Sequence, residues 1–420
     1  MSEIPQLKMR LHMKEKIPQR LYSDDFSVHT LEEGGDRVWE WIVGASFRTN
    51  VSFSSMRNDP AFRPERVFFT RQYAQDIATA SAFFREGAGY LHMVATHPWC
   101  AGFGAGRSAV IAALGYFWDN GAFDVFLTTD DFRLPAIHEY LELGFVPDCE
   151  GDDTAQGRWD AVFENLARHE KTAHAPIECI PETGVTMKPF PVEGSKSAVI
   201  VCPGGAYRFR ASHEGDPICR MLQSAGISAY RLDYRLTPNP ISVPLEDAKR
   251  AIRTLRHMGY EKVGILGFSA GGHLACMAAV HHDSGDPNAK DPVERESSRP
   301  DAFLPCYPLV TLMEPKDPEE LAFVETLLGK GATESDREAF SAERNVTPDT
   351  PPAFIWHTAE DAVVPPQVHT LPLAAKLAEN SVPYALHIFA RGAHGLGLAG
   401  GTEAGEWTDL AVQWLREQGF

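Results

Sequence analysis

The feature that most constrains the fold is a regular alternation of short apolar segments and longer amphipathic segments over residues 198–418. Short apolar segments are typical of strands buried on both faces, and the segments between them repeat their apolar residues at helical spacing. This pattern predicts a mostly parallel sheet covered by helices on both faces. The predicted strands are 198–201, 227–231, 263–266, 302–307, 353–357 and 384–389, and the main predicted helices are 214–225, 270–281, 370–380 and 406–418.

A glycine-rich pentapeptide, Gly267-Phe268-Ser269-Ala270-Gly271, separates one of these strands from the helix that follows. Glycines on either side of a serine let the backbone bend tightly and let strand and helix approach closely. The serine oxygen then projects beside a helix N-terminus, where partial positive charge favours a developing anion. We therefore interpret Ser269 as a nucleophile.

A serine hydroxyl needs a base, and the base needs a carboxylate to orient it. Asp361 and His394 each follow a predicted strand, in loops at the edge where sites on parallel sheets gather. Glu360 is the rival carboxylate. Asp361 is preferred because Val363 and the two residues after it would then pack back beneath the loop. The other histidines considered suit packing or surface roles better: His273, His281, His369 and His387.

A second glycine-rich stretch follows the first buried strand and offers backbone amides near the nucleophile. Glycines in such a loop let the backbone approach a substrate oxygen without an intervening side chain. The candidate oxyanion donors are the amides of Gly205, Ala206 and Ala270. Cys202, at the start of the stretch, is interpreted as a core residue.

Four segments of this second half of the chain carry a resemblance to the α/β-hydrolase acetyl esterases, including acetylxylan esterase-like enzymes. They are VIVCPGGAYRFRASHEGDP, GILGFSAGGHLA, WHTAEDAVVP and HIFARGAHGLGLA. The resemblance covers residues from about 177 to the C-terminus and implies hydrolysis of short acyl esters, typically acetyl groups on sugars. Ala206 stands where such loops often have a third glycine, although its amide remains a donor.

The first half of the chain has a different informative run. A predicted strand at 91–95 leads into a glycine-rich turn and an apolar helix at 108–117. Successive amides at a helix N-terminus bind pyrophosphate well. A strand at 125–129, a helix at 136–143 and a short strand beginning at Phe145 follow.

The segments THPWCAGFGAGR and LTTDDFRLPAIHEYLELGF resemble the GNAT acyl-CoA N-acetyltransferases over residues 89–148. The resemblance implies acetyl-CoA as co-substrate and Tyr140 as general acid toward the leaving thiolate. Ala101 replaces the Arg or Gln often found at the start of the loop. The implied pyrophosphate-binding amides are those of Phe103, Gly104, Ala105, Gly106 and Arg107, and the strand that would pair with the pantetheine contains Met93, Val94 and Ala95.

With 420 residues, the chain exceeds what one hydrophobic core usually serves. A charged stretch at 168–176 without hydrophobic periodicity marks the predicted boundary. The prediction is therefore an α/β protein: a GNAT-like domain with a mixed sheet at 1–170, then an α/β-hydrolase domain with a mostly parallel, doubly wound sheet at 171–420.

The formal net charge of −18 argues against nucleic acid or an anionic membrane as the main partner. Seven cysteines without a CxxC pair suit a reducing compartment and indicate neither a disulfide framework nor a metal site. The first sixteen residues contain no apolar core of a secretory signal, and no apolar run is long enough to span a bilayer. We expect a cytoplasmic protein.

Three functions compete at this point. The first is a bifunctional enzyme with an acetyltransferase and a cofactor-independent acetyl esterase, whose substrate would be a small ester such as an imported acetylated oligosaccharide. The second is an esterase whose first domain is a non-catalytic binding or assembly module. The third, a peptidase, is disfavoured because no propeller-type domain precedes the hydrolase segment. The sequence leaves a homo-oligomer open.

Overall fold

The computed structural model describes residues 5–18, 23, 25–169, 175–180, 183–313, 315 and 318–420. The chain divides into two compact units, Met1–Ala173 and His174–Phe420. The stretch that the sequence assigns to the boundary, 168–176, lies largely outside the described residues, which stop at 169 and resume at 175.

The first unit is built on a seven-stranded sheet in the order β2-β3-β4-β5-β6-β1-β7. The pairs from β2 through β5 are antiparallel, β5 and β6 are parallel, and β1 pairs antiparallel with both β6 and β7. The first strand of this unit, β1, therefore lies between its last two strands, β6 and β7. The strands are β1 (Leu7–His12), β2 (Phe26–Thr30), β3 (Val67–Gln72), β4 (Gln75–Arg85), β5 (Ala88–Thr96), β6 (Asp124–Thr129) and β7 (Val146–Asp148).

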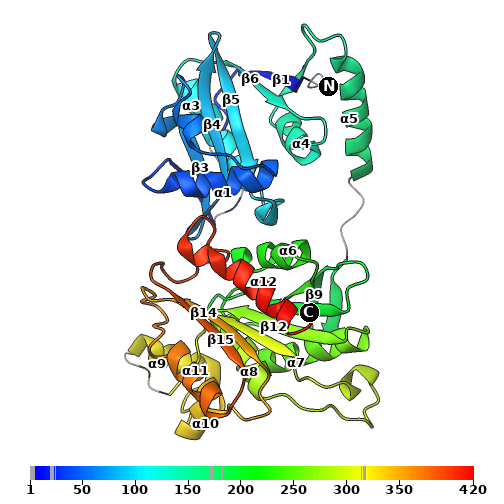
Figure 1. The fold of residues 1–420 in the computed structure, drawn as a ribbon, viewed down its shortest axis with the longest axis vertical. Helices are drawn as coiled ribbons and strands as arrows, with labels where there is room; N and C mark the ends of the chain where they lie inside the picture. The colour runs from blue at the N-terminus through cyan, green and yellow to red at the C-terminus, as the bar shows by residue number, and fades with distance from the viewer. Residues whose placement is uncertain are drawn as a thin grey trace. The chain divides into compact units, whose positions relative to one another are not determined.

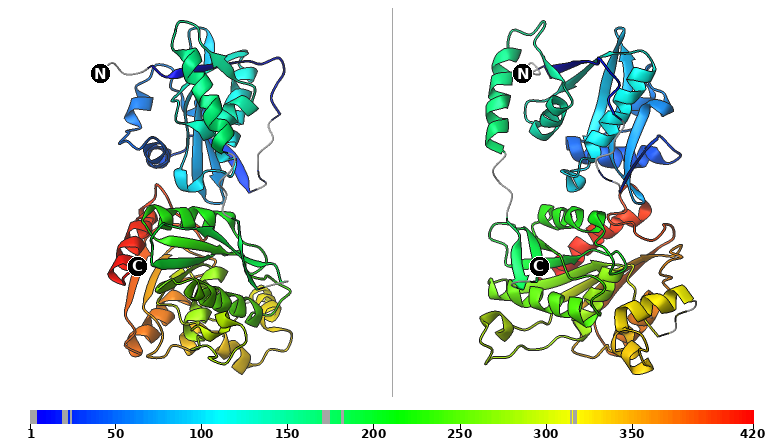
Figure 2. Two further views of the ribbon diagram at one scale, coloured as in Figure 1. Left: turned by 90° about the vertical axis from the view of Figure 1, so that its right-hand side faces the viewer. Right: turned by 180° about the vertical axis from the view of Figure 1, so that it is seen from behind.

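Helices cover both faces of this sheet (Figures 1 and 2). The alternation of side chains along β3 shows why: Val67 and Phe69 pack in the core beneath α1, and Phe68 packs in the core beneath α3. Strand β3 thus contributes to two cores, one on each face of the sheet. The helices are α1 (Gly35–Phe47), α2 (Ser54–Arg57), α3 (Ala105–Asp119), α4 (Leu134–Glu142) and α5 (Ala155–His169).

The second unit is built on an eight-stranded sheet in the order β15-β14-β13-β12-β10-β11-β9-β8. The six strands from β15 to β11 in this order are parallel, whereas β9 pairs antiparallel with β11 and β8. The strands are β8 (Ile177–Ile180), β9 (Val185–Phe190), β10 (Ser197–Cys202), β11 (Ser228–Leu232), β12 (Lys262–Phe268), β13 (Ala302–Cys306), β14 (Ala353–Thr358) and β15 (Tyr384–Phe389).

In this unit α6 and α12 lie on one face of the sheet, and α7, α8 and α11 lie on the other (Figure 1). Within the described residues, no helix combines the length and apolar character needed to cross a bilayer. The helices are α6 (Asp216–Ser224), α7 (Ser242–His257), α8 (Ala270–Val280), α9 (Pro318–Leu328), α10 (Glu334–Ala339), α11 (Thr370–Glu379) and α12 (Trp407–Glu417).

The predicted fold class is confirmed for both units, with most strand and helix ends displaced by a few residues at most. One difference matters for the site. The helix expected from Glu214 begins at Asp216, and a separate 3-10 turn, Ser212–Glu214, precedes it. Gly215 between them has φ −107° and ψ −101°, which lies outside helical geometry. This break lets the side chain of Glu214 point elsewhere than along α6.

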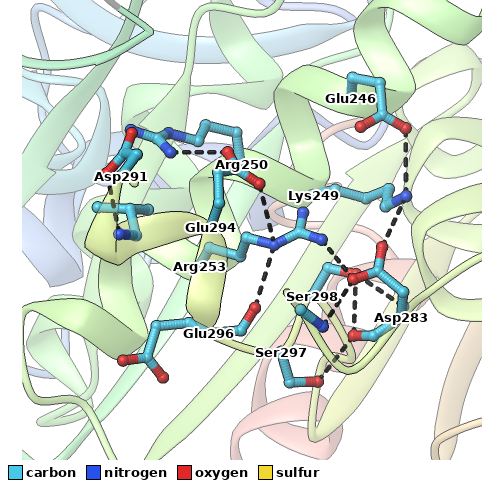
Figure 3. Close-up of polar contacts among 12 residues, drawn as sticks. Glu246, Lys249, Arg250, Arg253, Asp283, Asp291, Glu294, Glu296, Ser297 and Ser298 are labelled. Carbon is cyan, nitrogen blue, oxygen red and sulfur yellow. Dashed lines mark hydrogen bonds and ion pairs between the residues drawn. The ribbon is translucent and has the colours of Figure 1, made fainter. Parts of the chain in front are cut away.

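A cluster of ion pairs holds the long connection between α8 and β13 against α7 (Figure 3). The guanidinium of Arg253 donates to Asp283 and, at 3.1 Å, to the carbonyl oxygen of Glu296. Lys249 pairs with Asp283 at 2.9 Å, and Arg250 pairs with Glu294 at 2.7 Å. Because Arg253 is buried, its charge depends on these partners.

We expect Arg253→Met to lower the free energy of unfolding by about 2 kcal/mol, because hydrogen bonds to charged groups are lost and Asp283 keeps fewer partners. Urea unfolding monitored by tryptophan fluorescence measures the change. Lys290→Met is the matched control, since it removes one positive charge from an exposed position on the same connection. Equal stability losses in the two variants would contradict a structural role for the cluster.

Candidate active sites

The turn between β12 and α8 forces Ser269 into a strained backbone conformation, with φ 52° and ψ −117°. Non-glycine residues rarely adopt a positive φ, and strain of this kind concentrates at functional sites. The positions on either side require glycine, because backbone atoms approach both of them too closely for a side chain. A Cβ on Gly267 would lie 1.9 Å from the carbonyl oxygen of Gly271, and a Cβ on Gly271 would lie 2.1 Å from the carbonyl oxygen of Cys202.

The three predicted triad residues form one hydrogen-bonded chain. His394 Nε2 lies 2.8 Å from Ser269 Oγ, and His394 Nδ1 lies 2.6 Å from Asp361 Oδ2. With Nδ1–H donating to the carboxylate, Nε2 is free to accept the serine proton. The geometry is that of a nucleophile, a base and an orienting carboxylate. These residues follow β12, β14 and β15, so three parallel strands deliver them to one edge of the sheet.

Asp361 is almost fully buried, and four donors surround its carboxylate. Oδ1 accepts the backbone N–H groups of Val363 and Val364, each at 2.9 Å. Oδ2 accepts from His394 and, at 3.1 Å, from His357 Nε2. Burial would raise the pKa of this carboxyl, but the hydrogen bonds from the two histidines and the charge of His394 outweigh burial and hold the pKa well below its usual range.

The rival carboxylate, Glu360, lies elsewhere, with Oε2 accepting from the backbone N–H of Gly392 at 3.1 Å. The reason for preferring Asp361 was nevertheless wrong in part. Val363 is 70% exposed and does not pack beneath the loop. The residues after Asp361 support it through their backbone amides instead, because a turn there points two N–H groups at the carboxylate.

The predicted oxyanion loop lies directly beside the nucleophile. A Cβ on Gly204 would lie 3.1 Å from Cβ of Ser269. Gly205, Ala206 and Tyr207 have φ values of 122°, 52° and 57°. The positive φ at Ala206 gives a physical reason why a third glycine suits this position. Ala270, the remaining predicted donor, is the first residue of α8, where backbone N–H groups have no acceptor within the helix.

His273, one turn after Ser269 on α8, holds the predicted oxyanion loop through a hydrogen bond to Tyr207. Its Nε2–H donates to the carbonyl oxygen of Phe340 at 2.8 Å, and Nδ1 accepts from the hydroxyl of Tyr207, also at 2.8 Å. This pattern needs a neutral ring. Burial lowers the pKa of His273 from 6.5 to about 4. The expected packing role thus includes a hydrogen bond to the oxyanion loop.

Cys202 ends β10 and is completely buried. Burial raises the pKa of its thiol, which opposes formation of the nucleophilic thiolate. The interpretation of Cys202 as a core residue agrees with this placement.

In the first unit, the predicted pyrophosphate loop leads into α3. Gly104 precedes the helix with φ 79°, and Ala105, Gly106 and Arg107 form its first turn. Their amides have no acceptor within the helix. A Cβ on Gly106 would lie 2.5 Å from Thr96 Oγ1, so a side chain there would force Thr96 or the turn to shift. The Arg107 side chain pairs with Glu139 at 3.1 Å, which leaves its amide as its contribution to the loop.

The strand expected to meet the pantetheine carries a bulge. In the β4–β5 register, Thr79 faces Ala95 and Ser81 faces His92, so the register shifts across Met93 and Val94. Met93 has φ 47°. On the other side, the β5–β6 ladder in the described residues covers Gly89 and Tyr90 alone. The backbone of Met93, Val94 and Ala95 therefore runs beyond the end of the ladder with β6.

Tyr140 lies on α4 and packs in the core of the first unit, with its ring centroid 5.9 Å from that of Phe145. It is 6% exposed, and burial raises the pKa of its hydroxyl, which keeps the group protonated. A general acid must be protonated, but its hydroxyl must also be accessible to the leaving thiolate. Its role as general acid stays a prediction.

Three buried residues near the triad were missed at the level of sequence: His357, Glu214 and Tyr307. His357 lies within β14, four residues before Asp361, and its Nδ1 contacts Thr370 Oγ1 at 2.7 Å. Its polar side chain in an otherwise apolar predicted strand was the available signal. Glu214 and Tyr307 carry no comparable signal, because their contacts join segments far apart in the chain.

The parallel sheet, its single reversed strand beside β11 and the serine turn after β12 define the second unit as an α/β-hydrolase, and the first unit is a GNAT-type α/β domain. The BD-FAE family profile matches residues 188–377, and the profile of the Acetyltransferase (GNAT) family matches residues 29–145. The chain belongs to the BD-FAE esterases through its second unit and carries a GNAT acetyltransferase domain in its first.

Similar proteins are esterases and xylan-degrading enzymes. A crystal structure of an acetyl ester-xyloside bifunctional hydrolase from Caldicellulosiruptor lactoaceticus is 39% identical, with TM-score 0.55, and covers 59% of this chain and 97% of that one. Endo-1,4-beta-xylanase B of Butyrivibrio fibrisolvens is 37% identical, over 49% of this chain and 33% of that protein. An acetylxylan esterase of Xylanibacter ruminicola is 26% identical, over 55% of this chain and 46% of that protein. The chain thus spans a third to about half of these two curated relatives.

The buried neutral His273 makes stability depend on pH. The unfolded ring takes up a proton near 6.5, and the folded ring only near 4, so the unfolded state binds more protons between these values. The stability is fully present above about 6.5 and falls as the pH drops toward 4, by about 3 kcal/mol from this group. Urea unfolding at pH 7 and 4.5 should show a larger loss for the wild type than for His273→Gln. Identical losses would contradict the assignment.

Proposed function

We propose that the second unit is a serine esterase that removes short acyl groups, chiefly acetyl, from esters of sugars. The observation that supports this most directly is the hydrogen-bonded chain from Ser269 Oγ through His394 to Asp361 Oδ2, on a strained turn beside the glycine-rich loop that follows β10. The acetyl and sugar parts of the proposal draw on the printed descriptions of the similar proteins, an acetylxylan esterase and an acetyl ester-xyloside hydrolase.

In the proposed mechanism, His394 Nε2 takes the proton of Ser269 as Oγ bonds to the ester carbonyl carbon. The carbonyl oxygen becomes an oxyanion, to which the amides of Gly205, Ala206 and Ala270 donate. The intermediate collapses, the alcohol leaves with the proton from His394, and an acetyl-serine remains. A water molecule, deprotonated by His394, then adds to this ester, and acetate leaves as the serine recovers its proton.

We expect Ser269→Ala to lower kcat for p-nitrophenyl acetate by at least about 10⁴-fold, because the covalent route is lost. The release of p-nitrophenolate measures the rate. Ser284→Ala is the matched control, since it removes a hydroxyl from an exposed position on the connection between α8 and β13. Wild-type turnover by Ser269→Ala would eliminate the proposal.

We further propose that the first unit transfers an acetyl group from acetyl-CoA to an amine. Acetyl-CoA would supply the activated acetyl group. The amides of Phe103, Gly104, Ala105, Gly106 and Arg107 would bind its pyrophosphate, and the bulged strand at Met93, Val94 and Ala95 would pair with its pantetheine. The close fit of Gly106 against Thr96 supports this use of the turn. Tyr140 would donate a proton to the departing thiolate.

We expect wild-type protein to bind coenzyme A in isothermal titration calorimetry, and Gly106→Ala to bind it about tenfold more weakly, because the added methyl displaces the turn from Thr96. Gly157→Ala is the control, since a Cβ there meets no atom within 4 Å. If wild-type protein releases no heat at millimolar coenzyme A, the first unit is instead the non-catalytic module of the alternative hypothesis.

The proposed location is a reducing compartment, the cytoplasm, in keeping with seven free cysteines.

A further inference from the structure

The 3-10 turn Ser212–Glu214, between the oxyanion loop and α6, carries a carboxylate that the proposed mechanism does not use. Glu214 is 2% exposed. Its Oε2 accepts the backbone N–H of Gly204 at 2.8 Å, and its Oε1 accepts the hydroxyl of Tyr307 at 2.6 Å. Burying a carboxylate costs free energy unless hydrogen bonds or opposite charges offset it, so the buried position of Glu214 needs an explanation.

The contacts continue from Glu214 to the loop that carries His394. The hydroxyl of Tyr307, which follows β13, accepts the backbone N–H of Gly397 at 2.8 Å. In the same turn, His213 Nε2 donates to the carbonyl oxygen of Gly395 at 2.8 Å. One short turn therefore connects the segments that follow β10, β13 and β15.

The partners of Glu214 differ from those of the next carboxylate in the chain. Asp216 is equally buried, but Lys188 and Arg231 each contact it at 2.6 Å, so it has two cations to offset its charge. Glu214 is bound by a backbone amide and a neutral hydroxyl instead, and the Nε2 of His213, 3.6 Å away, already donates to a carbonyl. Pairing with a lysine or arginine therefore does not account for Glu214 among the described residues.

The amide that Glu214 engages belongs to the residue immediately before the proposed oxyanion donors. A Cβ on Gly204 would lie 2.6 Å from Glu214 Oε2 and 3.1 Å from Cβ of Ser269, so Gly204 is enclosed between the two side chains. With its N–H directed at Glu214, the next amides, of Gly205 and Ala206, are the ones left to face a substrate oxygen.

We propose that Glu214 is a positioning residue for the esterase reaction. Its carboxylate fixes the oxyanion loop at Gly204 and, through Tyr307, fixes the loop of His394, so that the oxyanion donors and the base keep a common geometry. The inference rests on the proposed esterase function and names a residue to which the triad mechanism assigns no part.

The test compares Glu214→Leu, Glu214→Gln and Tyr307→Phe in p-nitrophenyl acetate hydrolysis. Glu214→Leu should lower kcat about 10- to 100-fold with KM changed less than about threefold, because displaced donors affect the transition state more than substrate binding. Glu214→Gln should recover part of the loss, since its amide oxygen can accept one of the two hydrogen bonds. Tyr307→Phe should show a smaller fall, since Gly204 keeps its partner.

A second readout separates positioning from general destabilisation. Phenylboronic acid forms a tetrahedral adduct with an active serine, and its inhibition constant should rise about tenfold in Glu214→Leu. Asp216→Asn is the matched control: it should lower the melting temperature but keep kcat and the inhibition constant near wild type. Should Glu214→Leu fail to fold, Glu214→Gln and Tyr307→Phe carry the test.

A kcat within threefold of wild type in folded Glu214→Leu would overturn the inference. If that variant does not fold, a kcat equal to wild type in both of the milder variants would overturn it. Ser269→Ala in the same assay distinguishes the two failures. If Ser269→Ala is inactive and the Glu214 variants are not, the positioning role alone is wrong. If Ser269→Ala is active, the esterase assignment itself fails.

Discussion

A close backbone approach in the second unit, between the start of α8 and the end of β10, determines the rest of the site. The carbonyl oxygen of Cys202 occupies the space that a side chain on Gly271 would need, at 2.1 Å from the ideal Cβ position. Because the helix comes so near, the loop after β10 passes directly beside Ser269. Nucleophile and oxyanion loop are neighbours because Gly271, which has no side chain, lets the start of α8 lie against the end of β10.

Around this contact, a general arrangement recurs: the groups proposed to react are partly accessible, and the groups that orient them are buried. His394 is held by Asp361, Asp361 by His357, and the oxyanion loop by His273. Each supporting hydrogen bond lies in a low-dielectric interior, where it is stronger and where losing a partner costs more. The contacts that orient the reacting groups are thus made by buried side chains of the second unit itself.

The fold and the site could be predicted from the sequence wherever the informative residues lie close together in the chain, and not where the contact joins distant segments. Ser269 is recognisable because its glycines are adjacent, and the strand–helix alternation around it repeats often enough to indicate a parallel sheet. Asp361 and His394 follow from their places after strands, although the argument from Val363 failed because burial of a loop residue has no local signature. Glu214 and Tyr307 could not be predicted from the sequence, because the contact between them joins residues from separate elements. Hydrophobic periodicity gives no information about such a pair. Periodicity likewise placed Tyr140 on a helix face without saying how deeply it would be buried.

The place of β1 in the first unit has a consequence for how that unit forms. Its neighbours in the sheet, β6 and β7, come from the opposite end of the unit's sequence. Synthesis makes this strand first, yet its backbone groups stay unpaired until nearly the whole unit has emerged. Sheets whose pairings join distant segments fold slowly, because loop closure comes before the contacts that compensate for it. The first strand therefore acts as the closing piece of the unit, and a nascent chain that stops short of β7 would present an unsatisfied strand edge to its surroundings.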